Sequence, residues 1–160
     1  MAGLEDLYRE IILDHYRSPR NRGDLPVPPA HKVEGFNPLC GDEVVLYIDV
    51  DPDTDAVRDV KIGGQGCSIS QASTSMMSAA VKGKSVEETR RLIRAFKALM
   101  SIHESKLEGD GDGADLQADL EGVRLGDLEA LQGVVKFPVR IKCATLAWNT
   151  LQQALEESGA

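Results

Sequence analysis

Three cysteines and one aspartate are the residues of this chain best suited to chemistry. Cys40, Cys67 and Cys143 are widely spaced, odd in number and form no Cys-x-x-Cys pair, so they do not fit a disulfide framework. Asp42 follows Cys40 after a single glycine, Gly41, which can adopt an unusual backbone angle and let both side chains converge on one point. Three thiolates and a carboxylate would make a four-ligand set suited to tetrahedral zinc.

The other two cysteines are expected near the starts of helices. Cys67 follows the glycine-rich stretch 63–66 at a strand-to-helix junction, where backbone amides favour a thiolate. Cys143 lies beside Arg140 and Lys142 near the start of the last helix, and cations also favour thiolates. We expect Arg140 to offset the negative charge of the site or to contact a partner. The residues alone leave a second interpretation open, in which the cysteines have no chemical role, because a buried free cysteine is usually a small hydrophobic side chain.

The elements that must position these residues follow from hydrophobic periodicity and turn residues. A three- and four-residue repeat of apolar side chains predicts helices, and runs of β-branched residues predict strands. The short turn at 52–56 predicts an antiparallel hairpin. The glycine-rich stretch at 63–66 is expected to end the sheet. The predicted helices span 4–17, 68–83, 85–101, 125–132 and 138–157, and the predicted strands span 32–37, 43–50 and 57–62.

Length indicates one domain over residues 1–160. The net charge of −8 argues against nucleic acid and against an anionic membrane surface. The 4% aromatic content argues against a platform on which bases stack. The charged N-terminus has no signal-peptide core, so we expect a cytoplasmic protein with reduced thiols. The stretch at about 105–130 contains the acidic, glycine-rich GDGDGAD and is expected to be a mobile insertion.

Four motifs in order resemble the SufU-type branch of the NifU/IscU-like iron–sulfur cluster assembly family. The resemblance covers essentially the whole chain and rests on LYREIILDHYRSPRNRG at 7–23, NPLCGD at 37–42, GQGCSISQASTSMM at 64–77 and RIKCATLAW at 140–148. It implies an α+β fold, with a three-stranded antiparallel sheet packed by helices in one compact domain. It also implies zinc bound by the residues that match the family's ligands, which are Cys40, Asp42, Cys67 and Cys143.

Two departures separate this chain from the scaffold members of that family. Scaffold members have a histidine directly before the last cysteine, where this chain has Lys142, and a Leu-Pro-Pro-Val-Lys segment, where this chain has KFPVR at 136–140. The insertion at 105–130 is also typical of the SufU-type branch. These features favour a protein that accepts persulfide sulfur from a SufS-like cysteine desulfurase and supplies downstream iron–sulfur assembly proteins.

In the mechanism that this resemblance implies, Cys40 carries the persulfide. A histidine of the desulfurase takes one zinc position and releases Cys40, which is then free to attack because the thiolate is the nucleophile. Two alternatives stay open. The protein could be a scaffold on which an iron–sulfur cluster is assembled and passed on, or a structural zinc protein that only docks to and activates its partner.

Overall fold

The computed structural model describes residues 4–27, 30–38, 41–108, 128, 130–131 and 138–157, with side chains described except at 4–6, 101–108 and 138–139. Cys40 and residues 109–127, the greater part of the predicted insertion, lie outside these ranges, as does most of the predicted helix 125–132. The helices are α1 (Leu4–Arg17), α2 (Ser68–Val81), α3 (Val86–Glu108) and α5 (Pro138–Glu157), and the strands are β1 (His31–Asn37), β2 (Asp42–Val50) and β3 (Val57–Gln65).

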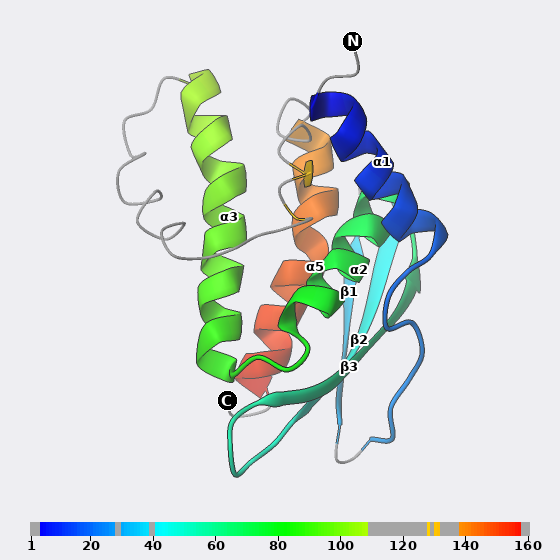
Figure 1. Ribbon diagram of the computed structural model, residues 1–160, viewed down its shortest axis with the longest axis vertical. Coiled ribbons are helices and arrows are strands. Elements are labelled where there is room, and N and C mark those ends of the chain that lie inside the picture. Colours follow the sequence, from blue (N-terminus) through cyan, green and yellow to red (C-terminus); the bar gives the residue numbers. More distant parts are fainter. Residues whose placement is uncertain are drawn as a thin grey trace.

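The three strands form an antiparallel sheet in the order β1-β2-β3, as the short turn between the last two predicted. Val44, Leu46 and Ile48 of β2 are buried and alternate with more exposed residues, so one face of the sheet meets the core. Helices α2 and α5 cover that face, with α5 against β1 and β2 and α2 against β3 (Figure 1). The predicted α+β class with a three-stranded antiparallel sheet is confirmed.

The sheet extends further than the sequence predicted. Strand β3 continues through the glycines to Gln65, which pairs with Glu43, whereas the glycines were expected to end the strand at residue 62. Gly64 has φ +107, and a Cβ atom there would overlap the backbone of Glu43. The glycines therefore let two backbones approach closely, which is a second reason for glycine in a strand.

Helix α3 is also longer than predicted, because it runs to Glu108 rather than to about residue 101. The sequence SIHESKLE at 101–108 contains no proline or glycine, and the first strong helix breaker after it is Gly109. Residues 105–108 therefore belong to α3 and not to an irregular insertion. None of the described helices is both long and apolar enough to cross a membrane.

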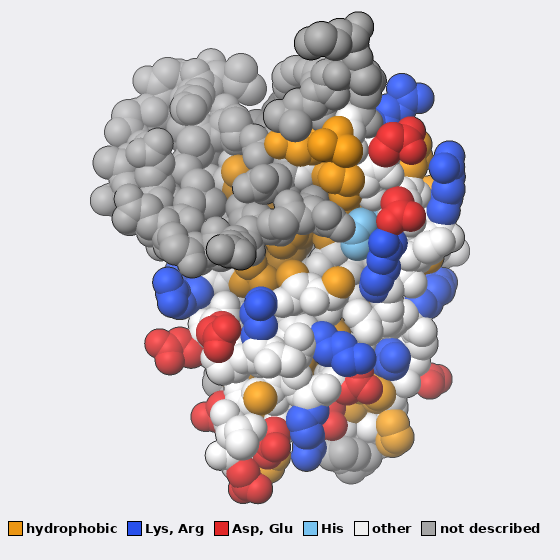
Figure 2. Space-filling view, in the orientation of Figure 1, with side chains coloured by type: hydrophobic (Ala, Val, Ile, Leu, Met, Phe, Trp, Pro, Cys, Tyr) orange, Lys and Arg blue, Asp and Glu red, His pale blue; other side chains and the backbone are white. Residues whose placement is uncertain are grey.

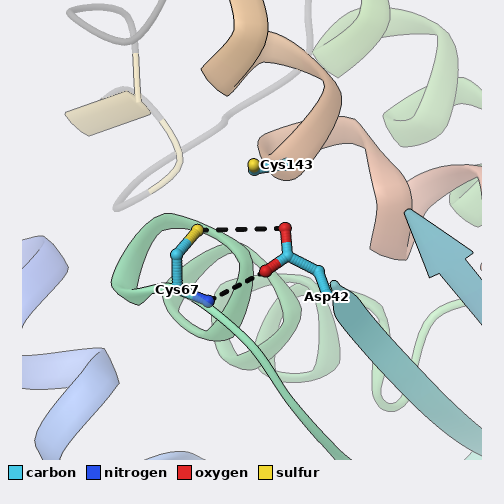
Figure 3. A group of neighbouring side chains, drawn as sticks. All are labelled: Asp42, Cys67 and Cys143. Atoms are coloured by element: carbon cyan, nitrogen blue, oxygen red, sulfur yellow. Dashed lines mark hydrogen bonds between the residues drawn. The ribbon is translucent and has the colours of Figure 1, made fainter. Parts of the chain in front are cut away.

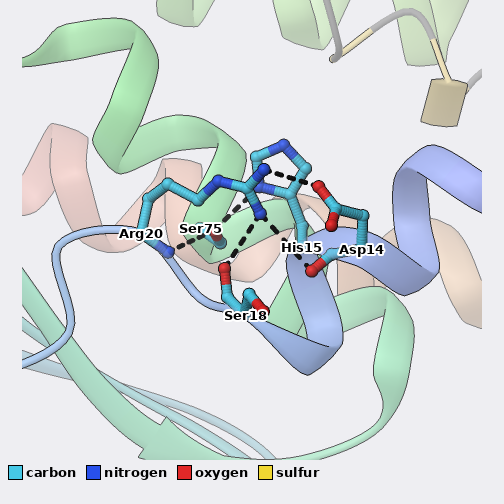
Figure 4. A network of polar contacts seen from close by, with 5 residues as sticks. All are labelled: Asp14, His15, Ser18, Arg20 and Ser75. Carbon is cyan, nitrogen blue, oxygen red and sulfur yellow. Dashed lines mark hydrogen bonds and ion pairs between the residues drawn. The ribbon is translucent and has the colours of Figure 1, made fainter.

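Buried hydroxyl groups join helix α2 to its neighbours. His15 of α1 is buried, and its Nδ1 lies 2.8 Å from Ser75 Oγ, which also accepts a hydrogen bond from the backbone N–H of Arg20 at 2.8 Å (Figure 4). On the opposite side, Ser73 Oγ donates to the carbonyl of Ala144 at 2.6 Å and accepts from Trp148 Nε1 at 3.2 Å. These contacts fix α2 between α1 and α5, the arrangement that positions Cys67 and Cys143.

Candidate metal centre

Asp42, Cys67 and Cys143 come together at one end of the sheet, although they lie far apart in the sequence. One ligand atom of each lies within 4.8 Å of the others (Figure 3). Asp42 begins β2, Cys67 immediately precedes α2, and Cys143 lies in the second turn of α5. The structure thus brings together three of the four residues that the sequence singled out, while Cys40, the fourth, lies outside the described residues.

The carboxylate of Asp42 is fully buried and points at Cys67. Its Oδ1 accepts the backbone N–H of Cys67 at 2.9 Å, and its Oδ2 lies 3.9 Å from the Cys67 sulfur. Gly66 makes this contact possible, because a Cβ atom at that position would overlap Asp42 Oδ1. The glycine before Cys67 therefore serves the carboxylate, a role that the sequence analysis did not assign.

Cys67 is the N-cap residue of α2, with φ −69 and ψ 167. Its sulfur accepts a hydrogen bond from the backbone N–H of Ser70 at 3.4 Å, in the manner of a capping side chain. The positive end of the helix dipole lies at the same place. The prediction that Cys67 stands at the start of a helix is thus confirmed.

Cys143 is fully buried between α5 and the first two strands. Asn37 Nδ2 lies 3.9 Å from its sulfur, and Asn37 pairs with Asp42 across β1 and β2. Helix α5 can pack this closely on β1 because Gly35 has no side chain: a Cβ atom there would overlap Thr150 Oγ1. Asn37 and Gly35 thus help to position the last cysteine. The sequence motif at 37–42 contains Asn37 but gave no role to it, and Gly35 was not singled out, because the partners of both lie in the distant last helix.

Arg140 lies at the exposed edge of the centre, one turn before Cys143. Attraction to Cys67, followed by hydrogen bonding and attraction to Cys143, raises the pKa of the Arg140 guanidinium above its ordinary value. The guanidinium thus faces both sulfur atoms, as expected of a cation that offsets the negative charge of the site. Lys142, the other nearby cation, is exposed.

The chemistry of this donor set fits a zinc ion. A buried carboxylate is costly unless a cation or hydrogen-bond donors compensate its charge, and two sulfur atoms stand beside it. Zn–S and Zn–O distances near 2.3 and 2.0–2.2 Å imply ligand atoms roughly 3–4 Å apart around one tetrahedral ion. The group within 4.8 Å needs to contract only slightly to reach that geometry.

Comparisons with known proteins agree with these observations. The model of the NifU-like N terminal domain matches residues 7–116. The chain is 44% identical over 160 residues to the zinc-dependent sulfurtransferase SufU of Bacillus subtilis (strain 168), covering 99% of this chain and 97% of that protein. It is 39% identical over 158 residues to the iron–sulfur cluster assembly scaffold protein IscU of Streptococcus pyogenes serotype M1, covering 99% of this chain and 88% of that protein.

A solved structure carries the same fold. It belongs to a protein of Fervidobacterium islandicum AW-1 that is described as a candidate iron–sulfur cluster assembly scaffold for the SUF system. The TM-score is 0.68 at 33% identity, and the match covers 96% of this chain and 99% of that one. The family match over most of the chain, the full-length relatives and the shared fold give one conclusion: this chain belongs to the NifU-like N-terminal domain family, as a SufU-type, IscU-like iron–sulfur cluster assembly protein.

Proposed function

We propose that this protein is a zinc-dependent sulfur acceptor, which takes persulfide sulfur from a cysteine desulfurase for iron–sulfur cluster assembly. The observation that carries the proposal is the convergence of Asp42, Cys67 and Cys143 within 4.8 Å. The relative named as a zinc-dependent sulfurtransferase, which matches the chain over nearly its whole length, supports the choice of metal and activity.

In this proposal Asp42, Cys67 and Cys143 hold the zinc ion together with Cys40. The bound ion would keep the cysteines as thiolates and cross-link three distant segments of the chain. Arg140, exposed and attracted to both described sulfur atoms, reduces the negative charge of the site and stands where a partner can reach it.

Cys40 is the proposed sulfur acceptor. Its thiolate attacks the outer sulfur of the persulfide on the desulfurase: a new S–S bond forms on Cys40, the S–S bond on the desulfurase breaks, and the desulfurase cysteine leaves as a thiolate. In the sequence Cys40 lies between Pro38 and Gly41, both of which are exposed, whereas Cys67 and Cys143 are held by α2 and α5. A histidine of a SufS-like desulfurase would replace Cys40 on the metal when the two proteins meet.

The second candidate function is that of a scaffold that assembles a cluster and passes it on. The full-length relative named as an IscU scaffold favours it. Against it, Lys142 stands where scaffold members of the family have a histidine before the last cysteine, and an ammonium group cannot ligate a metal unless it first loses its proton. Both functions need reduced thiols, so we place either of them in the cytoplasm.

The decisive experiment measures sulfide release by the cognate cysteine desulfurase with and without the zinc-loaded protein. After incubation with cysteine and blocking of thiols, peptide mass spectrometry should find the extra sulfur on Cys40. The variant Cys40→Ala should no longer accelerate sulfide release. A variant that still accelerates it at the wild-type rate would favour a docking role, and a stable iron–sulfur cluster after anaerobic purification would favour the scaffold.

A further inference from the structure

The first turn of α2 contains a buried hydroxyl group whose capacity to form hydrogen bonds is not used within the fold. Within the described part of the chain, Ser70 is fully buried and its Oγ has no hydrogen-bond partner. Such a group costs free energy, because it has lost its water and gained nothing in return. Natural proteins rarely keep an unpaired buried hydroxyl without a functional reason.

The other buried hydroxyl groups of α2 make the contrast clear. Ser73, Thr74, Ser75 and Ser78 are all buried on this helix, and each one has a hydrogen-bond partner. Burial in α2 is therefore compatible with full hydrogen bonding. The exception, Ser70, is the one of these residues that lies nearest to Cys67 in the sequence.

One contact of Ser70 and one contact of Ser73 show where Ser70 lies relative to the metal centre. Its own backbone N–H already points at the sulfur of Cys67, at 3.4 Å, and only two bonded carbons separate that nitrogen from Oγ. One turn further along α2, Ser73 contacts Ala144, the residue that follows Cys143. Ser70 therefore lies on the side of α2 that faces the start of α5, between the pair Cys67–Cys143 and the contact of Ser73.

We propose that Ser70 is a positioning residue for the metal centre, whose hydroxyl donates a hydrogen bond to the sulfur of Cys67 when that sulfur binds metal as a thiolate. This inference rests on the metal centre of the proposed function. A thiol is a weak acceptor, but a thiolate is charged and accepts much more strongly. Ser70 would then supply a second donor, beside its backbone N–H, to the ligand that caps α2.

The hydrogen bond would tune how firmly Cys67 holds the metal. Donors to a metal-bound sulfur spread its negative charge, and loss of such outer partners typically weakens metal affinity about 10–100-fold. Because this centre has an excess of anionic ligands, each donor reduces the charge repulsion among them. Cys67 would in this way stay on the metal while another ligand is exchanged.

The test compares wild type, Ser70→Ala, Ser70→Thr and the control Ser78→Ala. Ser78 is another buried serine of α2, but its hydroxyl lies at the far end of the helix with partners of its own. Cobalt(II) is the probe, because zinc has no visible spectrum. Each variant is titrated with cobalt(II) against a chelator, its sulfur-to-metal charge-transfer band is recorded, and its melting temperature is measured with and without metal.

Ser70→Ala should bind cobalt about tenfold more weakly and shift the charge-transfer band to longer wavelength, because the sulfur loses a hydrogen bond. Without metal its melting temperature should be unchanged or higher, since an unpaired buried hydroxyl has been removed. Ser70→Thr should restore the wild-type band, and Ser78→Ala should leave both band and affinity unchanged.

Two results would overturn the inference. If Ser70→Ala keeps the wild-type cobalt affinity and charge-transfer band, the inference about Ser70 is wrong, although the metal centre itself still stands. A melting temperature that falls equally with and without metal would show that the hydroxyl serves the fold instead. If wild type itself shows no charge-transfer band beyond that of Cys143→Ala, the metal centre of the proposed function fails, and this inference fails with it.

Discussion

Gly66 and Asp42 are in direct contact: the α-carbon of the glycine packs so closely against the aspartate that a Cβ atom would overlap Oδ1. The next residue, Cys67, donates its backbone N–H to the same oxygen at 2.9 Å. A glycine in the loop before α2 thereby fixes where a carboxylate from β2 stands. The orientation of the proposed oxygen ligand depends on the absence of one side chain.

Replacing this glycine should damage the metal centre more than the fold. In Gly66→Ala the new methyl group must push the Asp42 carboxylate aside, so zinc retention against a chelator should fall by at least about tenfold. Gly63→Ala is the matched control, because a Cβ atom there meets only Val45 at an ordinary 3.7 Å. Equal zinc retention in the two variants would contradict the role assigned to Gly66.

Removing zinc should lower the melting temperature substantially. A ligand at a thousandfold excess over its Kd stabilises the native state by about 4 kcal/mol, and each kcal/mol corresponds to about 2–4 °C for a chain of this size. We therefore expect a loss of about 10 °C after chelation, measured by circular dichroism. Asp42→Ala should already melt low and respond little to the chelator, whereas an equal response in that variant would place the stabilising metal elsewhere.

Arg140 should contribute to metal retention through its charge. Its guanidinium is attracted to Cys67 and Cys143, so Arg140→Gln removes a cation that offsets the anionic ligands, and zinc retention should fall a few-fold. Because the group is exposed, salt should weaken the effect. Lys142→Gln, which removes a neighbouring exposed cation, is the control. An equal loss of zinc retention in the two variants would show that Arg140 acts only through the net charge of the protein, not through its position beside the sulfur atoms.

Ser73 should matter for stability rather than for chemistry. Its hydroxyl bridges the carbonyl of Ala144 and the indole N–H of Trp148, and Trp148 stacks on Phe96 with ring centroids 4.6 Å apart. Ser73→Ala leaves two buried groups without this partner, so unfolding of the metal-free protein should cost about 1–3 kcal/mol less.

Urea denaturation followed by the fluorescence of Trp148, the single tryptophan of the chain, measures that change. Ala79→Ser, which alters an exposed position of the same helix, should leave the midpoint unchanged. A wild-type midpoint in Ser73→Ala would show that water replaces the hydroxyl.

The net charge of the chain does not describe how charges are arranged on its surface. The chain carries a net charge of −8, yet many Lys and Arg side chains lie on the face drawn in Figure 2, interspersed with acidic ones. Some of the charged side chains form ion pairs, for example Arg20 with Asp14 and Lys82 with Asp59. Net charge gives the sum over the chain, and only the fold decides which charges become neighbours.

Local pattern was sufficient to predict most of the elements. The bounds of α1 and α5 match the predicted helices 4–17 and 138–157, because their apolar spacing and their Pro and Ser-Pro boundaries are properties of short segments. The antiparallel hairpin of β2 and β3 followed from a short turn. The predicted C-terminal ends of α3 and β3 were wrong. The lack of a helix breaker before Gly109 and the strand pairing that glycines allow at 63–65 are weaker local signals than apolar spacing.

The sequence by itself determined which residue types were present for a metal centre: thiols, a carboxylate and cations at the ends of elements. Only the tertiary structure decided that Asp42, Cys67 and Cys143 meet within 4.8 Å. The physical reason is that their convergence depends on packing between distant segments. Gly35 lets α5 approach β1, Gly66 lets the carboxylate approach Cys67, and the unpaired hydroxyl of Ser70 becomes visible only once burial is known.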